Sequence, residues 1–222
     1  MDTAPNPARP ADGHLTITPS ILYFGTPVVL LTTENADGTV NLAPISSAWA
    51  LGQTVVLGLG AQGQTGANLA VRPEMVISLP EPRQWPAVEH LGGLTGRPEA
   101  AGHGPRRARY EPDKFRATGF RAQASHTVRP PRVAECPIQL EARAARVATA
   151  AAGDFLIVEA RVLKVHADPR LVVPGTQHID PAAWSPLIYN FRHYFGLGPE
   201  LGRSGVSETP CTSRPVSAVP GR

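Results

Sequence analysis

The sequence predicts a mainly β protein made of antiparallel strands with short helical insertions. Residues 26–47 contain two β-rich runs joined across Asp37-Gly38, a turn pair that suits the positive backbone angles of a tight hairpin. Residues 138–150 and 154–168 are two longer β-type runs separated by Ala-Ala-Gly, and such a pair is expected to form an antiparallel ribbon. Both observations place consecutive strands side by side, which favours an antiparallel sheet.

The remaining elements lie between these two pairs. Residues 53–60 and 74–80 are short strand candidates, and residues 67–72 between them carry about two turns of helical pattern. Pro73 ends that helix after about eight residues, because proline cannot continue a helical hydrogen-bond ladder. A further helical turn is predicted at residues 113–120.

The second run of the ribbon shows two faces. Odd-numbered residues from Phe155 to Val165 fall on one face of a strand, and even-numbered residues from Leu156 to His166 fall on the other. This period of two supports a strand over the whole run.

The chain is predicted to hold one domain with a tail at each end. Residues 1–14 and 203–222 are rich in Pro, Ser, Thr and Gly, so they cannot bury enough apolar surface to offset chain entropy. We expect these tails to be disordered and residues 15–202 to form the domain. Within it, residues 91–137 have few apolar runs and are interpreted as a long functional excursion without a core of its own.

Composition and charge exclude several classes of function. The net charge is +3, but the arginines are scattered instead of forming a stripe with aromatic residues, so nucleic-acid binding is not expected. No window approaches the roughly 18 apolar residues of a membrane span, and the N-terminus shows no signal-peptide pattern. Cys136 and Cys211 lack metal-ligand spacing, and free thiols fit a cytoplasmic protein.

The stretch "VVLGLGAQGQTGANLA", residues 55–70, matches the G-x-G-x-x-G fingerprint of dinucleotide-binding Rossmann domains, and Glu81 stands near the place of its acidic residue. The glycines of this pattern are Gly58, Gly60 and Gly63. However, Pro73 limits the helix to fewer residues than the dozen or so that a parallel crossover needs. Because hairpins also surround the stretch, we do not expect a Rossmann fold.

The start of this short helix is still a candidate phosphate site. The free N–H groups of a first helical turn, together with the helix dipole, favour a phosphate. Thr65 and Asn68 are three residues apart, so they face the same side of a helix and offer a hydroxyl and an amide. The alternative is that Thr65 and Gln64 only cap the helix.

Four stretches of the chain together carry a family pattern. They are "PVVLLTTENADGTVNLAPISSAWAL", "GQTGANLAVRPEMVISLP", "RPPRVAECPIQLEA" and "PLIYNFRHYFGLG". The most specific part is N-x-A-P-x-S-S after a hairpin, followed about 15 residues later by a turn with T-x-x-N and a strand. From about Gly25 to Gly202, and most weakly over residues 97–128, the chain resembles the flavin reductase-like proteins with the FMN-binding split-barrel fold.

The resemblance implies a closed six-stranded antiparallel barrel with Greek-key connections and short helical insertions. It also implies a homodimer with a flavin near the subunit interface; FMN is the expected flavin and FAD the alternative. The residues expected along the isoalloxazine ring, largely through backbone groups, are Ser46, Ser47, Ala48 and Trp49. Those expected along the ribityl chain and phosphate are Gln62, Gly63, Gln64, Thr65 and Asn68.

The family pattern bears on two further places, the turn at Gln62 and Gln64 and the segment with His193 and Tyr194. Gln62 and Gln64 stand where many members place Lys, Arg or Asp near the phosphate, so this chain departs from the usual pattern there. His193 and Tyr194 belong to a segment that in the family lies near the flavin or the nicotinamide. They are therefore included among the expected cofactor-binding residues.

The resemblance implies an oxidoreductase, expected to reduce flavin with NADH or NADPH and to supply reduced flavin to a partner oxygenase. Hydride transfer to a flavin moves no separate proton through a side chain, so no catalytic side chain is predicted. The alternative is a non-catalytic flavin-binding protein or a flavoredoxin-like electron carrier.

Several residues keep two interpretations. Trp49 either stacks on the flavin or is a core aromatic residue. The run "GPRRARY" at 104–110 either meets the pyrophosphate of a nicotinamide nucleotide or is solvated. His166 ends the ribbon and is interpreted as a surface or hydrogen-bonded histidine. The seven histidines show no H-x-x-x-H spacing, so no metal site is predicted.

Overall fold

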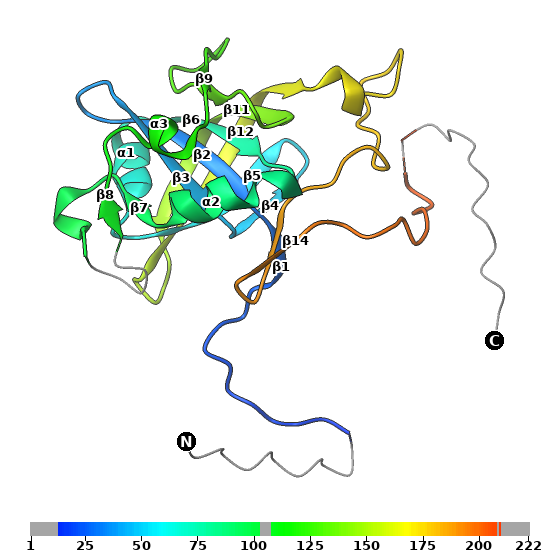
Figure 1. The fold of residues 1–222 in the computed structure, drawn as a ribbon, viewed down its shortest axis with the longest axis horizontal. Coiled ribbons are helices and arrows are strands. Elements are labelled where there is room, and N and C mark those ends of the chain that lie inside the picture. Colours follow the sequence, from blue (N-terminus) through cyan, green and yellow to red (C-terminus); the bar gives the residue numbers. More distant parts are fainter. Residues whose placement is uncertain (1–12, 103–107, 208, 210–222) are drawn as a thin grey trace.

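The centre of the molecule is an antiparallel β-barrel (Figure 1). The computed structural model describes residues 13–102, 108–207 and 209. Most of the predicted tails, and part of the run at 104–110, lie outside these residues. In spatial order the strands of the main sheet are β3 (Val40–Ile45), β2 (Val29–Glu34), β6 (Glu74–Leu79), β11 (Ile138–Thr149), β12 (Phe155–Ala167), β5 (Thr54–Gly60) and β4 (Ala48–Leu51). Each neighbouring pair is antiparallel.

The barrel closes through one bent segment of chain. β3 pairs with β2 and β4 pairs with β5, and only Ser46 and Ser47 separate β3 from β4. At the bend, the N–H of Gly58 donates to the carbonyl of Ser47 at 2.8 Å. A Cβ on Gly58 would lie 2.9 Å from the Cβ of Ser47, so this closure requires glycine.

The predicted fold class is confirmed. The sheet has seven strands instead of six because the bend divides one long strand into β3 and β4. β6 returns to pair with β2, and β12 pairs with β5, which gives the Greek-key order.

The first hairpin is confirmed, but its turn is longer than predicted. Five residues, 35–39, separate β2 from β3, and of the Asp37-Gly38 pair only Gly38 has a positive φ, 81°. Asp37 instead accepts hydrogen bonds from the N–H and the hydroxyl of Thr39 at 3.0 and 2.6 Å. A side-chain turn therefore replaces the tight hairpin turn.

The ribbon of β11 and β12 is also confirmed, including its two faces. Val158 and Ala160 are buried in the barrel, whereas Phe155 and Ile157 on the alternate face are partly exposed. The register shifts between Glu141 and Ala142, and again between Ala144 and Arg146, so two irregularities bend β11. These bends let one long strand follow the wall of a barrel.

The barrel interior forms the first hydrophobic core. Its buried members are Val29, Leu31, Ala48, Val55, Leu57, Leu59, Leu69, Met75, Ile77, Ala142, Val158 and Ala160. They come from every strand of the main sheet except β3, together with helix α1 (Gln64–Val71). The eight residues of α1 match the helix length that Pro73 predicts. β5 and β6 on either side of α1 are not neighbours in the sheet, so the absence of a Rossmann crossover is confirmed.

Residues 81–102 and 108–137 cover the outside of the barrel. This segment holds α2 (Trp85–Gly92), α3 (Lys114–Thr118), the two-residue strands β7 (Leu94–Thr95), β8 (Arg109–Tyr110), β9 (Ala122–Gln123) and β10 (Arg132–Val133), and the 3-10 turns Pro82–Gln84 and Pro98–Ala100. α3 confirms the predicted helical turn, while α2 was not predicted. The buried apolar residues of the segment form a second core with Val28, Leu30 and Leu42 of the barrel wall. The described residues of this segment therefore share a core with the barrel wall.

A small second sheet lies beside the bend. It consists of β1 (Phe24–Pro27), β13 (Ile188–Asn190) and β14 (His193–Phe195), in the order β1-β13-β14. Between the main sheet and β13, a 3-10 turn, Pro169–Leu171, follows β12.

Cys136 is a free, buried thiol of the second core, and Cys211 lies outside the described residues. Within the described part of the chain, no helix has the length and apolar character needed to cross a membrane.

Candidate functional site

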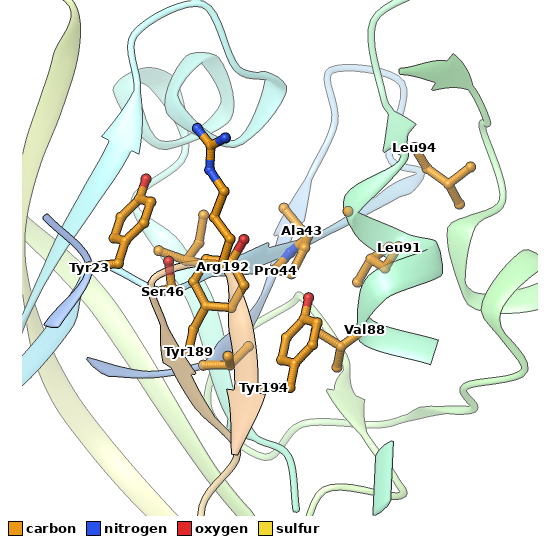
Figure 2. A pocket seen from close by; sticks show the side chains of 13 residues that line it. Tyr23, Ala43, Pro44, Ser46, Val88, Leu91, Leu94, Tyr189, Arg192 and Tyr194 are labelled. Atoms are coloured by element: carbon orange, nitrogen blue, oxygen red, sulfur yellow. The ribbon is translucent and has the colours of Figure 1, made fainter. Parts of the chain in front are cut away.

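A cavity of about 510 Å³ lies between the end of β3, helix α2 and the β13–β14 hairpin (Figure 2). Its volume is within the range of ligand pockets in proteins. The lining residues are Tyr23, Val28, Ala43, Pro44, Ile45, Ser46, Val88, Leu91, Gly92, Leu94, Tyr189, Arg192 and Tyr194. Apolar and aromatic side chains thus meet a few polar groups, which is the usual composition of a site for a flat organic ligand.

Three tyrosines make the aromatic part of this cavity. The rings of Tyr23 and Tyr189 are 5.6 Å apart between centroids, and those of Tyr189 and Tyr194 are 5.2 Å apart. The hydroxyl of Tyr194 donates to a carboxylate oxygen of Glu89 on α2 at 2.8 Å. The hairpin is therefore fixed to both β1 and α2, so the tyrosine rings keep their positions.

The tip of the hairpin is strained. Phe191 and Arg192 have φ values of 44° and 68°, and they are the non-glycine residues with positive φ in the described chain. A two-residue hairpin needs this backbone geometry, but Asn-Gly satisfies it far more easily than Phe-Arg. The N–H of Phe191 donates to the carbonyl of Tyr23 at 2.7 Å, and Figure 2 shows Arg192 on the cavity lining. Such strain commonly persists where side chains serve a ligand.

The residues expected along the isoalloxazine ring are divided by the structure. Ser46 lines the cavity, and Ser47 is exposed and closes the barrel through its carbonyl group. Ala48 is buried in the first core. Trp49 does not belong to the core, because 58% of its surface is exposed on β4.

The start of α1 offers free backbone donors. Gly63 is the N-cap, and no side chain in the described residues caps this helix. Gln62 and Gly63 are exposed. A guanidinium reaches the same turn from outside: Arg97 donates to the carbonyl of Gln62 at 3.1 Å and to the side-chain oxygen of Gln64 at 3.4 Å. A helix dipole, first-turn N–H groups and an arginine are the features that favour an anion.

The side chains of Thr65 and Asn68 are directed into the protein. Both are buried, and Asn41 donates to the hydroxyl of Thr65 at 3.0 Å. The amide nitrogen of Asn68 donates to Thr33 and Asn35 at 3.0 and 2.9 Å, while its oxygen accepts from Gln64 at 2.8 Å. These bonds fix α1 to the first hairpin.

A second cavity, of about 320 Å³, adjoins this turn and contains a buried cation. Lys114 of α3 is 5% exposed, and its ammonium group donates to the side-chain oxygen of Asn41 at 2.9 Å and to the carbonyl of Leu42 at 3.0 Å. Burial lowers the pKa of Lys114 to about 8. Gln64 also lines this cavity and accepts a hydrogen bond from Arg97, so Lys114 and Arg97 both lie near the turn.

The last two expected residues differ in position. Tyr194 lines the large cavity, whereas His193 is exposed and does not. Sequence reasoning did not single out Tyr23, Tyr189, Arg97 or Lys114 for the site. Only the cluster of aromatic residues in "LIYNFRHYF" could have indicated the tyrosine wall, because the two cations reach the turn from distant parts of the chain.

An antiparallel barrel that closes through a bent segment, with a ligand-sized cavity beside the bend, defines this protein as a split-barrel protein. The family described as "Flavin reductase like domain" matches residues 21–198. The chain belongs to this family of flavin-binding oxidoreductases, as the resemblance implied.

Individual relatives agree with this family. The chain is 43% identical over 198 residues to the uncharacterized protein YdfE of Bacillus subtilis, covering 87% of this chain and 94% of that protein. The flavoredoxin of Desulfovibrio vulgaris superposes with a TM-score of 0.72 at 18% identity, covering 87% and 98% of the two chains. Nitrilotriacetate monooxygenase component B from Bacillus cereus gives 0.67 at 18% identity, covering 86% and 98%. At such identities the two structures support the fold alone.

Proposed function

We propose that this protein binds FMN, with FAD as the alternative, and reduces it with NADH or NADPH. The observation that carries the proposal is that one stretch of chain, β3 and the residues after it, contacts two features. One is the start of α1, which no side chain caps, and the other is the large aromatic cavity. Asn41 contacts Thr65 of α1, and Ser46, five residues further along the same chain segment, lines the cavity. At about 3.3 Å per residue, these points are roughly 17 Å apart along the chain, a distance suited to a ring and a phosphate at the two ends of one ligand.

The isoalloxazine ring would lie in the cavity. Pro44 has no N–H and the pairing with β2 ends at Ile45, so backbone groups near Ser46 are available to the polar edge of a flavin. Tyr189 and Tyr194 give an apolar wall against which a flat ring can pack. Ser46 is thus the predicted isoalloxazine residue that the cavity supports most directly.

The phosphate would lie at the turn before α1. Gln62 and Gln64 supply backbone N–H groups there, while the N–H of Gly63 donates to the carbonyl of Gly60 at 3.0 Å; Arg97 adds the cation that the glutamines lack. Thr65 and Asn68 shape this turn through their internal hydrogen bonds. In this arrangement the excursion, which supplies Arg97 and Lys114, compensates for the departure from the family pattern at Gln62 and Gln64.

Bound flavin would supply the redox chemistry by accepting a hydride. The residues of this chain would bind and orient it and exclude water from the cavity. Arg192 stands on the cavity lining and would meet the phosphate groups of the nicotinamide nucleotide, which places the nucleotide against the tyrosine wall. The strained tip formed by Phe191 and Arg192 is consistent with this role.

We further propose a homodimer. Trp49 and Leu51 of β4 and Phe155, Ile157 and Leu163 of β12 are large apolar side chains with 38–76% of their surface exposed, and β5 lies between these two strands. Large exposed apolar side chains gathered in one part of a sheet typically mark a protein interface. A second copy of the chain would cover it and bring each cofactor site near the interface. Light scattering of the purified protein should give twice the monomer mass.

The destination of the electrons has two candidates. The similarity to a component of nitrilotriacetate monooxygenase supports the supply of reduced flavin to an oxygenase. The similarity to a flavoredoxin supports a tightly held flavin that carries electrons. Flavin that dissociates readily would favour the first role, and flavin that stays through gel filtration would favour the second.

The central test uses the purified full chain. We expect FMN to bind and to acquire a shifted visible spectrum, and we expect NADH or NADPH oxidation that depends on added FMN, FAD or riboflavin. Failure to bind any flavin would refute the proposal. Binding without nicotinamide oxidation would support a non-catalytic carrier instead.

A variant pair tests the phosphate placement. Arg97→Met should weaken FMN binding by about tenfold, corresponding to about 1.4 kcal/mol, and leave riboflavin binding unchanged, because only FMN carries the phosphate. Arg121→Met is the matched control, since Arg121 is an exposed arginine paired with Glu135 elsewhere on the surface. An equal loss for FMN and riboflavin in the Arg97 variant would contradict the placement.

A further inference from the structure

Two histidines and a buried glutamate converge on the outer wall of the barrel. Glu141 lies on β11 and His166 on β12, and in the register of this pair Gln139 faces His166 while Glu141 faces Lys164. Glu141 and His166 are therefore diagonal neighbours on one face of the sheet. His126 comes from the loop between β9 and β10, and its ring meets that of His166 edge-on at 4.7 Å between centroids.

These side chains have the geometry of metal ligands. One ligand atom from each of His126, Glu141 and His166 lies within 4.8 Å of the other two. Tetrahedral zinc, with bonds of about 2.0–2.1 Å, sets its ligand atoms roughly 3.4 Å apart. Nε2 of His166 is now 2.6 Å from Oε1 of Glu141, so a metal ion would need these atoms to separate by less than about 1 Å.

The carboxylate of Glu141 is oriented so that one of its oxygens, Oε1, can bind a metal ion. Oε2 accepts hydrogen bonds from the N–H and hydroxyl groups of Thr127 and from the N–H of Val128 at 3.2 Å. Oε1 accepts from the N–H of His126 at 2.8 Å and faces the imidazole of His166. Outer hydrogen bonds of this kind fix the direction of a metal-binding carboxylate. The side chain itself is fully buried.

The cluster is open on one side and separate from the flavin site. His126 is exposed, so an ion held by three protein ligands would keep a coordination position toward water. None of the three residues lines the cavity of about 510 Å³ or the neighbouring one of about 320 Å³. Their sequence separations, 15 and 25 residues, correspond to no local metal motif, which is why spacing alone did not reveal them.

We propose that His126, Glu141 and His166 form a binding site for one divalent transition-metal ion of the zinc type. The carboxylate and two imidazoles are the donor set that zinc, cobalt and nickel accept. The ion would join the loop that holds His126 to β11 and β12, and so fasten the end of the excursion to the barrel. Binding would replace the hydrogen bond between His166 and Glu141: Nε2 of His166 would give its lone pair to the ion, and the neutral ring would carry its proton on Nδ1.

The test is a metal titration of the full chain after treatment with a chelator. Calorimetry with Zn²⁺ should give one site per chain, and Co²⁺ should produce a visible absorption band. At a hundredfold excess of Zn²⁺ over the Kd, Tm should rise by about 5–10 °C. None of these measurements depends on flavin or on turnover, so their outcome is independent of the proposed activity.

Three variants locate the site. His126→Gln and His166→Gln should each weaken Zn²⁺ binding at least tenfold and abolish the Co²⁺ band, while circular dichroism shows that they remain folded. His90→Gln, at an exposed position on α2, is the matched control and should bind as the parent does. The absence of stoichiometric binding in the parent, or equal binding in all three variants, would overturn the proposal.

Discussion

Two buried charges connect the excursion to the barrel, and they are satisfied to different degrees. Glu141 accepts hydrogen bonds from three consecutive backbone N–H groups, a hydroxyl and His166. Lys114 donates to an amide oxygen and a backbone carbonyl, and within the described residues it forms no ion pair. Both groups are almost fully buried, so the difference between them lies in their partners.

The pKa values express this difference. Burial alone would raise the pKa of Glu141, but hydrogen bonds from Thr127, His126 and His166 outweigh it and lower the pKa to about 2. Burial lowers the pKa of Lys114 to about 8, and its two neutral acceptors do not offset that. The buried carboxylate of Glu141 thus stays ionised because it accepts enough hydrogen bonds. The buried ammonium of Lys114, which has only two neutral acceptors, loses its proton more easily than usual.

Glu141→Gln should have the largest effect on stability. The amide that replaces one oxygen cannot accept hydrogen bonds, so buried N–H groups lose their acceptor and the free energy of unfolding should fall by about 3 kcal/mol. Urea denaturation would measure this. Glu135→Gln, which disrupts only the exposed pair with Arg121, should cost about 0.5 kcal/mol or less. Similar losses in the two variants would remove the distinction.

The acid dependence of stability should separate the parent from Glu141→Gln. Because the pKa of Glu141 is lower in the folded chain than its ordinary value of 4.5, its contribution is complete above pH 4.5 and is lost as the pH falls toward 2. Denaturation curves across this range should therefore converge for the two proteins. Curves that stay parallel would show that Glu141 is not the group responsible.

Lys114→Met should have a smaller effect, of about 1 kcal/mol or less at pH 7. The variant loses two hydrogen bonds but also removes a charge whose burial is unfavourable. In the parent, the folded-state pKa of about 8 is below the ordinary 10.5, so stability should rise between pH 8 and 10.5 as the unfolded chain holds the extra proton. That rise should disappear in the variant, and its persistence would point to another group.

The strained tip of the β13–β14 hairpin, beside the large cavity, extends the comparison to backbone strain. Replacing Phe191-Arg192 by Asn-Gly should raise the free energy of unfolding by about 1 kcal/mol, because these residues accept positive φ more easily. If the tip serves the nicotinamide nucleotide, the KM for that nucleotide should rise in the same variant. Greater stability with unchanged kinetics would show that the tip has no role in binding.

The barrel strands could be predicted because local pattern and final environment agree. The alternation from Phe155 to His166 is the alternation of the two faces of β12, and Pro73 ends α1 where the next strand must begin. The outer elements were harder to predict. The hairpin of β13 and β14 has Phe191-Arg192 where a turn usually carries Asn or Gly, so its sequence contains no turn signal.

In the candidate site, too, local features could be predicted from the sequence, whereas contacts between distant parts of the chain could not. The bend at Ser46 and the turn at Gln62–Gln64 are local features that the family pattern identifies. Arg97 reaches Gln64 across 33 positions, and Lys114 reaches Asn41 across 73. Such contacts depend on how the excursion packs against the barrel, and no local pattern records that packing.

The bend between β3 and β4 also has a consequence for association. A sheet normally has two edge strands whose unpaired backbone groups can recruit a strand from another molecule. Here one segment of chain supplies both edge strands: β3 pairs with β2, β4 pairs with β5, and only Ser46 and Ser47 lie between them. Because the chain bends at Ser46 and Ser47, a strand from another molecule could extend the backbone ladder over only the six residues of β3 or the four of β4. Short edges of this kind are poor templates for edge-to-edge aggregation.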